Sequence, residues 1–99
     1  MDYKVIWDDE AIEELGQIVR YIAEDNPLAA RRIGEAIFDQ TGRLGSFPQM
    51  GRKFRKLNRE AVREISVPPY RIIYQVKDAE RSVRILKVWH GARREPELK

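Results

Sequence analysis

The stretch YRIIYQV, residues 70–76, is the most hydrophobic segment of this 99-residue chain, yet it contains an arginine. Every second residue from Tyr70 to Val76 is hydrophobic and falls on one face of a strand, whereas Arg71 projects from the other face. Arginine stays charged at every accessible pH, and a buried charge without a partner is costly. The stretch therefore predicts a strand whose second face either pairs Arg71 structurally or offers it to an anionic partner.

Other parts of the sequence also have the pattern of strands. REISV (residues 63–67) alternates weakly, and SVRILKVWH (residues 82–90) alternates strongly after the polar turn KDAER (residues 77–81). DYKVIW (residues 2–7) is a short alternating segment near the N-terminus. The sequence thus predicts one strand at the start of the chain and three in its second half.

Two amphipathic helices are predicted between these strands. The first should run from about Asp9 to Glu24, with Asp8 as its N-cap. The second should begin at Pro27 after the cap Asn26 and stop near Gly45. Apolar residues follow helical spacing along each segment. The first stripe is Ala11, Leu15, Ile18 and Ile22, and the second is Ala30, Ile33, Ile37, Thr41 and Leu44.

The order β-α-α-β-β-β indicates a single α+β domain over residues 1–99. An antiparallel helical hairpin should pack on one face of a small, twisted antiparallel sheet of four strands. No helix remains to cover the second face, so Arg71 should look out of an open surface. On that basis Arg71→Ala should have a mild effect on stability.

The composition narrows the classes of function. The chain has no cysteine and one histidine, and the carboxylates of the first helix fall on its solvated face, so we expect neither thiol chemistry, a metal site nor a cofactor. No segment reaches the roughly 18 apolar residues that a membrane span needs. The start MDYKVIWDDE lacks the features of a secretory signal. A cytoplasmic protein with no membrane partner is expected.

Charge is divided unequally along the chain. The first 50 residues hold five basic and ten acidic side chains, whereas the last 49 hold fourteen basic and six acidic ones. This asymmetry favours a surface for nucleic acid or for an acidic protein, although a solvated surface without a partner is the plain alternative. The candidate binding residues are Arg52, Lys53, Arg55, Lys56, Arg63, Trp89, Arg93 and Arg94. Arg71 and His90 are candidates for handling a phosphodiester.

The chain resembles toxins of the RelE/ParE superfamily, the growth-inhibiting half of bacterial toxin–antitoxin pairs. The resemblance rests on YKVIWDDEAIEELGQIVRYI, NPLAARR, LGSFPQMGR, YRIIYQV and VWHGARR, which together cover nearly the whole chain in the family's order. It implies the fold described above. It also implies a cognate antitoxin whose C-terminal segment wraps the toxin.

One branch of this superfamily consists of ribosome-dependent, metal-independent messenger RNA endonucleases. The resemblance places Arg71 where they keep a catalytic arginine, and His90 near where one group keeps a catalytic histidine. Val62 and Glu64, however, stand where RelE itself presents lysines, and a carboxylate at residue 64 would repel the scissile phosphate. The terminal tyrosine of those enzymes has no counterpart after His90.

The other branch poisons DNA gyrase and needs no catalytic residues of its own. The P-x-x-G-R segment (Pro48 to Arg52) and the V-x-H-G-x-R ending favour this branch. A gyrase inhibitor is therefore the leading hypothesis, and a ribosome-dependent ribonuclease is the alternative. A third possibility is a toxin fold that has lost activity and only binds a partner.

The gyrase and the ribonuclease hypotheses both predict that an acidic antitoxin segment covers the basic sheet face. Trp89 is the expected anchor, since aromatic residues dominate binding hot spots. Simple burial of Trp89 in the core is the alternative.

Overall fold

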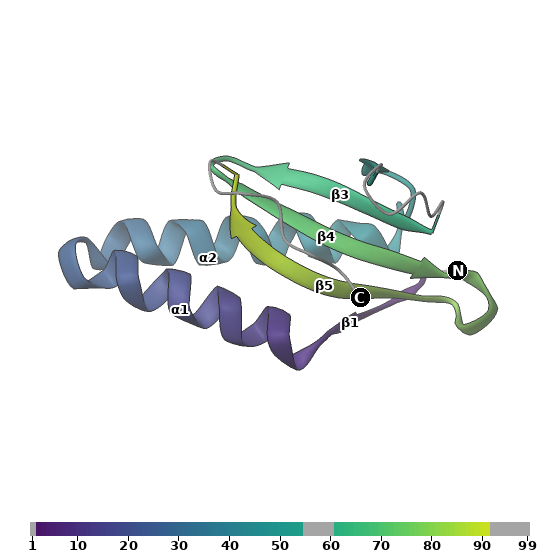
Figure 1. Ribbon diagram of the computed structural model, residues 1–99, viewed down its shortest axis with the longest axis horizontal. Coiled ribbons are helices and arrows are strands. Elements are labelled where there is room, and N and C mark those ends of the chain that lie inside the picture. The colour runs from purple at the N-terminus through teal and green to yellow at the C-terminus, as the bar shows by residue number, and fades with distance from the viewer. Residues whose placement is uncertain (1, 55–60, 92–99) are drawn as a thin grey trace.

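The computed structural model describes residues 2–54 and 61–91 and has the predicted order of elements (Figure 1). Strand β1 is followed by two helices, a short 3-10 turn at Arg43–Gly45 and the remaining strands. The bounds are β1 Lys4–Trp7, α1 Asp9–Asp25, α2 Pro27–Gly42, β2 Arg52–Lys53, β3 Val62–Val67, β4 Tyr70–Lys77 and β5 Ser82–His90.

The strands form one sheet in the order β1-β5-β4-β3-β2. All neighbours are antiparallel except β1, which runs parallel to β5. The predicted fold class is confirmed, but within residues 2–54 and 61–91 the sheet has five strands and not four, because the two-residue strand β2 adds to the edge of β3. A parallel neighbour requires a long crossover, and the helical hairpin with the later strands supplies it for β1.

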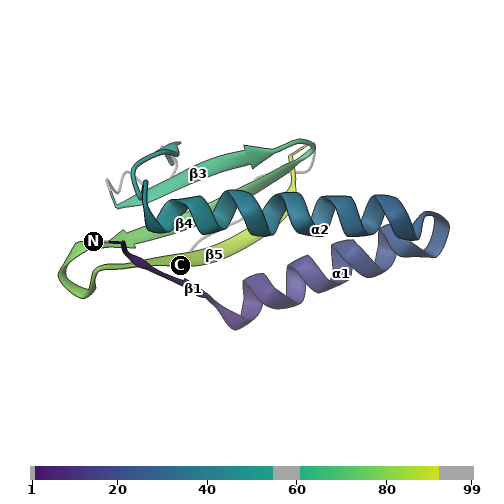
Figure 2. The ribbon, with the colours of Figure 1, turned by 180° about the vertical axis from the view of Figure 1, so that it is seen from behind.

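Both helices lie on one face of the sheet, with α1 over β5 and α2 beside it, and their connection projects past the end of the strands (Figure 2). The Asn26 side chain accepts a hydrogen bond from the Ala29 amide at 3.1 Å, and Pro27 opens α2, as predicted. Asp8 occupies the N-cap position of α1 without a capping hydrogen bond from its side chain. Its carboxylate pairs with Arg84 of β5 instead. None of the helices in the described part of the chain is long and apolar enough to cross a lipid bilayer.

The main core lies between the helices and the sheet. Strand β4 contributes every second residue from Tyr70 to Val76, and the facing helices contribute both predicted stripes. Ile37, Leu44, Ile72 and Tyr74 have no exposed surface. The sequence pattern therefore assigned the inner face of β4 correctly.

The second face of the sheet is less open than expected. It carries a smaller apolar cluster of Phe54, Val62, Ile73 and Trp89, which are between 0% and 8% exposed. Phe54 follows β2, and its amide donates to the Val62 carbonyl at 2.9 Å. We call this side, opposite the helices, the outer face. Neither α1 nor α2 covers this face (Figure 2), as expected, but the prediction of an open surface was wrong because Phe54 and Trp89 build a second small core there.

The pairing of β4 with β5 is irregular between Ile73 and Tyr74, where Leu86 of β5 is skipped, and next to it an ionic clamp joins β5 to α1. The ammonium group of Lys87 donates to Glu10 at 2.8 Å and to Glu14 at 2.7 Å, and Glu14 also accepts from the Val88 amide at 3.0 Å. Burial acts to lower the pKa of Lys87, but the two carboxylates outweigh it, so the pKa lies above its ordinary value.

Ile72→Ala should lower the free energy of unfolding by about 2–5 kcal/mol, because it leaves a cavity at a fully buried position. Ile12→Ala on α1 is the matched control, since Ile12 is 54% exposed, and it should stay within about 0.5 kcal/mol of the parent. Urea unfolding measures both. An Ile72→Ala variant as stable as the parent would show that the inner face is wrongly assigned.

Candidate functional site

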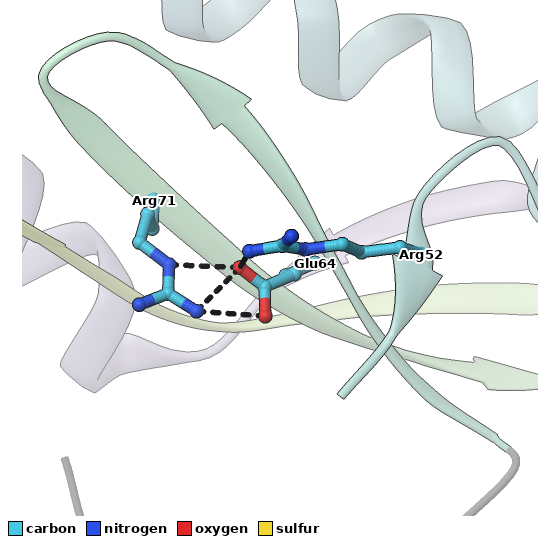
Figure 3. A network of polar contacts seen from close by, with 3 residues as sticks. All are labelled: Arg52, Glu64 and Arg71. Carbon is cyan, nitrogen blue, oxygen red and sulfur yellow. Dashed lines mark hydrogen bonds and ion pairs between the residues drawn. The ribbon is translucent and has the colours of Figure 1, made fainter. Parts of the chain in front are cut away.

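An ion pair between neighbouring strands dominates the polar groups of the outer face. Arg71 of β4 donates through Nε to Oε1 of Glu64 and through Nη2 to Oε2, both at 2.8 Å (Figure 3). The Glu64 side chain is 8% exposed and that of Arg71 is 19% exposed. This bidentate geometry is the strongest form of a side-chain ion pair. The sequence question about Arg71 is thus answered: the guanidinium points away from the helices and pairs with a buried carboxylate.

A second arginine approaches the same carboxylate from the opposite side (Figure 3). Strand β2 places Arg52 directly across from Glu64, and Nη2 of Arg52 donates to Oε1 at 3.2 Å. The Arg52 side chain is 74% exposed. The three residues, which we call the Arg52–Glu64–Arg71 triad, carry one formal positive charge, and Arg52 presents it to solvent.

Trp89 supports the triad from β5. It lies directly opposite Arg71 in the antiparallel pairing, and the guanidinium carbon of Arg71 is 4.8 Å from the ring centroid. This is a cation–π distance. Trp89 is 8% exposed, and its buried indole Nε1 has no hydrogen-bond acceptor within the described residues. Trp89 is therefore part of the outer core here, and its role as a partner's anchor stays a prediction.

His90 does not join Arg71. It lies opposite Tyr70, and the two rings meet edge to face with centroids 5.5 Å apart. Side chains directly across a strand pair share a face and successive residues alternate, so His90 is on the helix side while Arg71 is on the outer face. His90 lines a cleft of about 400 Å³ with Glu14 and Tyr21 of α1. The structure does not bring the two predicted phosphodiester-handling residues together.

The predicted basic residues also do not gather on one face of the sheet. Arg52 lies on the outer face, whereas Arg63 holds the segment before β2, donating through Nη1 to the Gly51 carbonyl at 2.8 Å. Lys53 is exposed and lies across from Arg63. The remaining predicted binding residues, Arg55, Lys56, Arg93 and Arg94, lie outside the described residues.

Sequence reasoning missed what the P-x-x-G-R segment does in the fold. The Tyr74 hydroxyl accepts a hydrogen bond from the Gly51 amide at 2.8 Å. A Cβ on Gly51 would lie 2.5 Å from the Glu64 carbonyl oxygen and 2.6 Å from the Tyr74 hydroxyl, so only glycine fits. Burial raises the pKa of Tyr74, and the Gly51 amide partly offsets it. Gly51 was the feature of the sequence that could have indicated this contact. A glycine lets the backbone before Arg52 lie close to β3 and β4, and this places Arg52 beside Glu64.

No group of three or more His, Cys, Asp or Glu side chains that could hold a metal ion occurs within residues 2–54 and 61–91. The polar groups of the outer face are instead arranged to bind one another and to present Arg52. The chemistry available there is recognition of an anionic group.

The helical hairpin on a mostly antiparallel sheet is the fold of toxins of the RelE/ParE superfamily. The profile of the family described as "ParE toxin of type II toxin-antitoxin system, parDE" matches residues 5–95. This chain belongs to that family of toxins. The resemblance seen in the sequence is confirmed.

Individual relatives come from both named groups of the superfamily. The chain is 36% identical over 90 residues to toxin RelE2 of Caulobacter vibrioides, a match that covers 91% of this chain and 97% of RelE2. It superposes on the chromosomal ParDE system from P. aeruginosa with a TM-score of 0.72 and 20% identity, covering 89% of this chain and 95% of that one. The RelBE2 complex of Mycobacterium tuberculosis gives a TM-score of 0.68 and 26% identity, with coverage of 91% and 99%.

Arg71→Ala should lower the free energy of unfolding by about 1–3 kcal/mol. The buried carboxylate of Glu64 loses its bidentate partner and keeps only Arg52 within the triad. This replaces the mild effect expected for an open face. Chemical unfolding of Arg71→Ala and of Arg71→Ala/Glu64→Gln tests it, since the second variant removes the stranded charge and should recover part of the loss.

The exposed pair Arg31–Glu35 on α2 provides the control for Arg71→Ala. Its side chains are 76% and 62% exposed, so Arg31→Ala should change stability by no more than about 0.5 kcal/mol. Equal effects of Arg71→Ala and Arg31→Ala would contradict a buried, structural pair.

Tyr74→Phe should lower the free energy of unfolding by about 0.5–1.5 kcal/mol at pH 7, because the Gly51 amide loses its acceptor. The folded-state pKa of Tyr74 lies above its ordinary value of 10.0. The phenol's contribution is therefore full below pH 10 and lost as the pH rises through the folded value. Thermal melts at pH 7 and above pH 10 should show the difference between parent and variant narrowing. A gap that widens at high pH would refute this assignment.

Proposed function

We propose that this chain is a growth-inhibiting toxin that poisons DNA gyrase and is neutralised by a cognate antitoxin. The observation that carries the choice of target is the Arg52–Glu64–Arg71 triad. An arginine held bidentately by a buried carboxylate is a poor partner for a scissile phosphate, because the carboxylate occupies its donors and repels the anion.

The separation of Arg71 from His90 supports the same choice. General acid–base cleavage of RNA needs its groups within hydrogen-bond reach of one phosphodiester. Here the two side chains project from opposite faces of the sheet. The match of residues 5–95 to the ParE family is a second, independent support. A poison of gyrase needs no assembled catalytic set.

A ribosome-dependent messenger RNA endonuclease is the second candidate. It is favoured by the position of Arg71 in the strand and by the 36% identity to the toxin named RelE2. On this alternative Arg71 and His90 would be catalytic and the partners would be the ribosome and its messenger RNA.

The antitoxin partner is proposed from the family match and from the toxin–antitoxin complexes among the structural relatives. We expect an acidic segment of the antitoxin to lie across the outer face and to place a carboxylate on Arg52, which is 74% exposed. Apolar contacts would supply most of the affinity, with charge setting specificity and association rate. Trp89 and the basic residues around it remain the proposed contact set.

The test incubates purified protein with gyrase, ATP and plasmid DNA and measures linear DNA released after detergent and protease treatment. The proposal predicts accumulation of cleaved plasmid, suppressed by the antitoxin. Intact gyrase activity together with translation-dependent cuts in messenger RNA would overturn it in favour of the second candidate. Neither effect, with harmless overexpression, would indicate a binding module only.

Arg71→Lys and His90→Gln separate the two targets further. Lysine keeps the charge opposite Glu64 but not the bidentate geometry. Both variants should still poison gyrase if the proposal holds. A ribonuclease that used these side chains would lose roughly 10²–10⁴-fold in cleavage rate, measured as cuts in a defined transcript on purified ribosomes.

A further inference from the structure

The donors around Glu64 have the geometry of an anion site. Two N–H groups of Arg71 and one of Arg52 converge on the two oxygens of one carboxylate, at 2.8, 2.8 and 3.2 Å. Arginine pairs bind carboxylate and phosphate with the same planar, bidentate geometry. The carboxylate that fills this site belongs to the chain itself.

We propose that Glu64 is an internal ligand that closes a two-arginine anion site to phosphate groups. Residue 64 would then determine specificity on the outer face, because a neutral side chain there would no longer compete with a phosphate for the two guanidinium groups. This inference deepens the proposed function. Its biological consequence, a face that binds an acidic protein segment but rejects RNA, rests on that function, whereas the phosphate binding itself does not.

The internal carboxylate has two advantages over a phosphate from solution. It is covalently held at the site, so it loses no translational or rotational freedom on binding. It also lies at 8% exposure, where the lower effective dielectric strengthens its pairing with Arg71. A phosphate that displaced it would leave a buried, unpaired carboxylate beside a second negative charge, which is unfavourable on both counts.

The site itself is prepared for a ligand. The face of Trp89 lies 4.8 Å from the guanidinium carbon of Arg71 and fixes its orientation through a cation–π contact. Arg52 is 74% exposed and enters from the edge strand β2, so the site is reached from solvent on that side. Removal of the charge on Glu64 would therefore take the competing anion away from donors that are already oriented.

The experiment titrates inorganic phosphate into the parent protein and into Glu64→Gln, at constant ionic strength held with chloride. Binding is followed by NMR through the Nε–H signals of the arginine side chains, with Arg71 assigned from Arg71→Lys. Glu64→Gln should bind phosphate at least about tenfold more tightly than the parent, because a like charge no longer faces the anion. The Arg71 signal should shift with saturation.

Three controls make the result decisive. Glu35→Gln changes the net charge by the same amount in the exposed Arg31–Glu35 pair and should produce no such gain. Glu64→Thr, a neutral residue that favours strands, replaces Glu64→Gln if the latter does not give a folded spectrum. Glu64→Gln/Arg71→Gln should lose the gain.

The proposal is overturned if folded Glu64→Gln or Glu64→Thr binds phosphate no better than the parent, or if Glu35→Gln gains equally. It is also overturned if the gain survives the loss of Arg71. None of these readings uses gyrase or ribosomes, so failure of the proposed target and failure of this inference are told apart.

Discussion

Strand β4 contributes to an apolar core on each of its faces, and the rest of the molecule is placed around it. It is the middle strand of the order β1-β5-β4-β3-β2. Its inner side chains, from Tyr70 to Val76, form the main core with the helices, and on its outer face Ile73 is also fully buried. A two-residue alternation at the centre of the sheet therefore sets which side receives the helices and which receives the charged triad. A shift of register by one residue would exchange the two.

The outer face carries one row of side chains across four adjacent strands. Arg52, Glu64, Arg71 and Trp89 come from β2, β3, β4 and β5, each in contact with the next. A buried ion pair is weak evidence for stability, because the loss of hydration offsets most of the attraction. The contacts along this row fix the orientation of the Arg71 side chain and hold the two-residue strand β2 at the edge of the sheet. Gly51 makes that anchoring possible by letting the chain pass within contact of Tyr74.

The sequence predicted the parts of this arrangement that depend on local periodicity. The helical stripes, the cap at Asn26 and the inner face of β4 follow from spacing, and all lie where expected. The parallel neighbour of β1 and the pairing of β2 could not be predicted, because a two-residue strand has no periodicity and strand neighbours depend on the whole chain. The outer core was missed since Phe54 lies on no regular element and meets Ile73 only after folding. Arg71 and His90 were both predicted to handle a phosphodiester, but the pairing of β4 with β5 decides the face on which each side chain lies. That register exists only in the folded sheet.

In the role proposed for Glu64, one buried carboxylate changes which anions the outer face can bind and leaves the fold unchanged. The same strands that would offer arginines to a phosphate offer them here to a carboxylate of the chain. A protein segment can still approach, because Arg52 keeps its exposed guanidinium and a flexible acidic side chain can meet it at the edge without displacing Glu64. A nucleic acid carries a negative phosphate at every nucleotide, so a phosphate that approached Arg71 would also meet the carboxylate of Glu64. The discrimination proposed for this face thus follows from where one negative charge is buried, and it leaves the fold, the core and the helical hairpin unaltered.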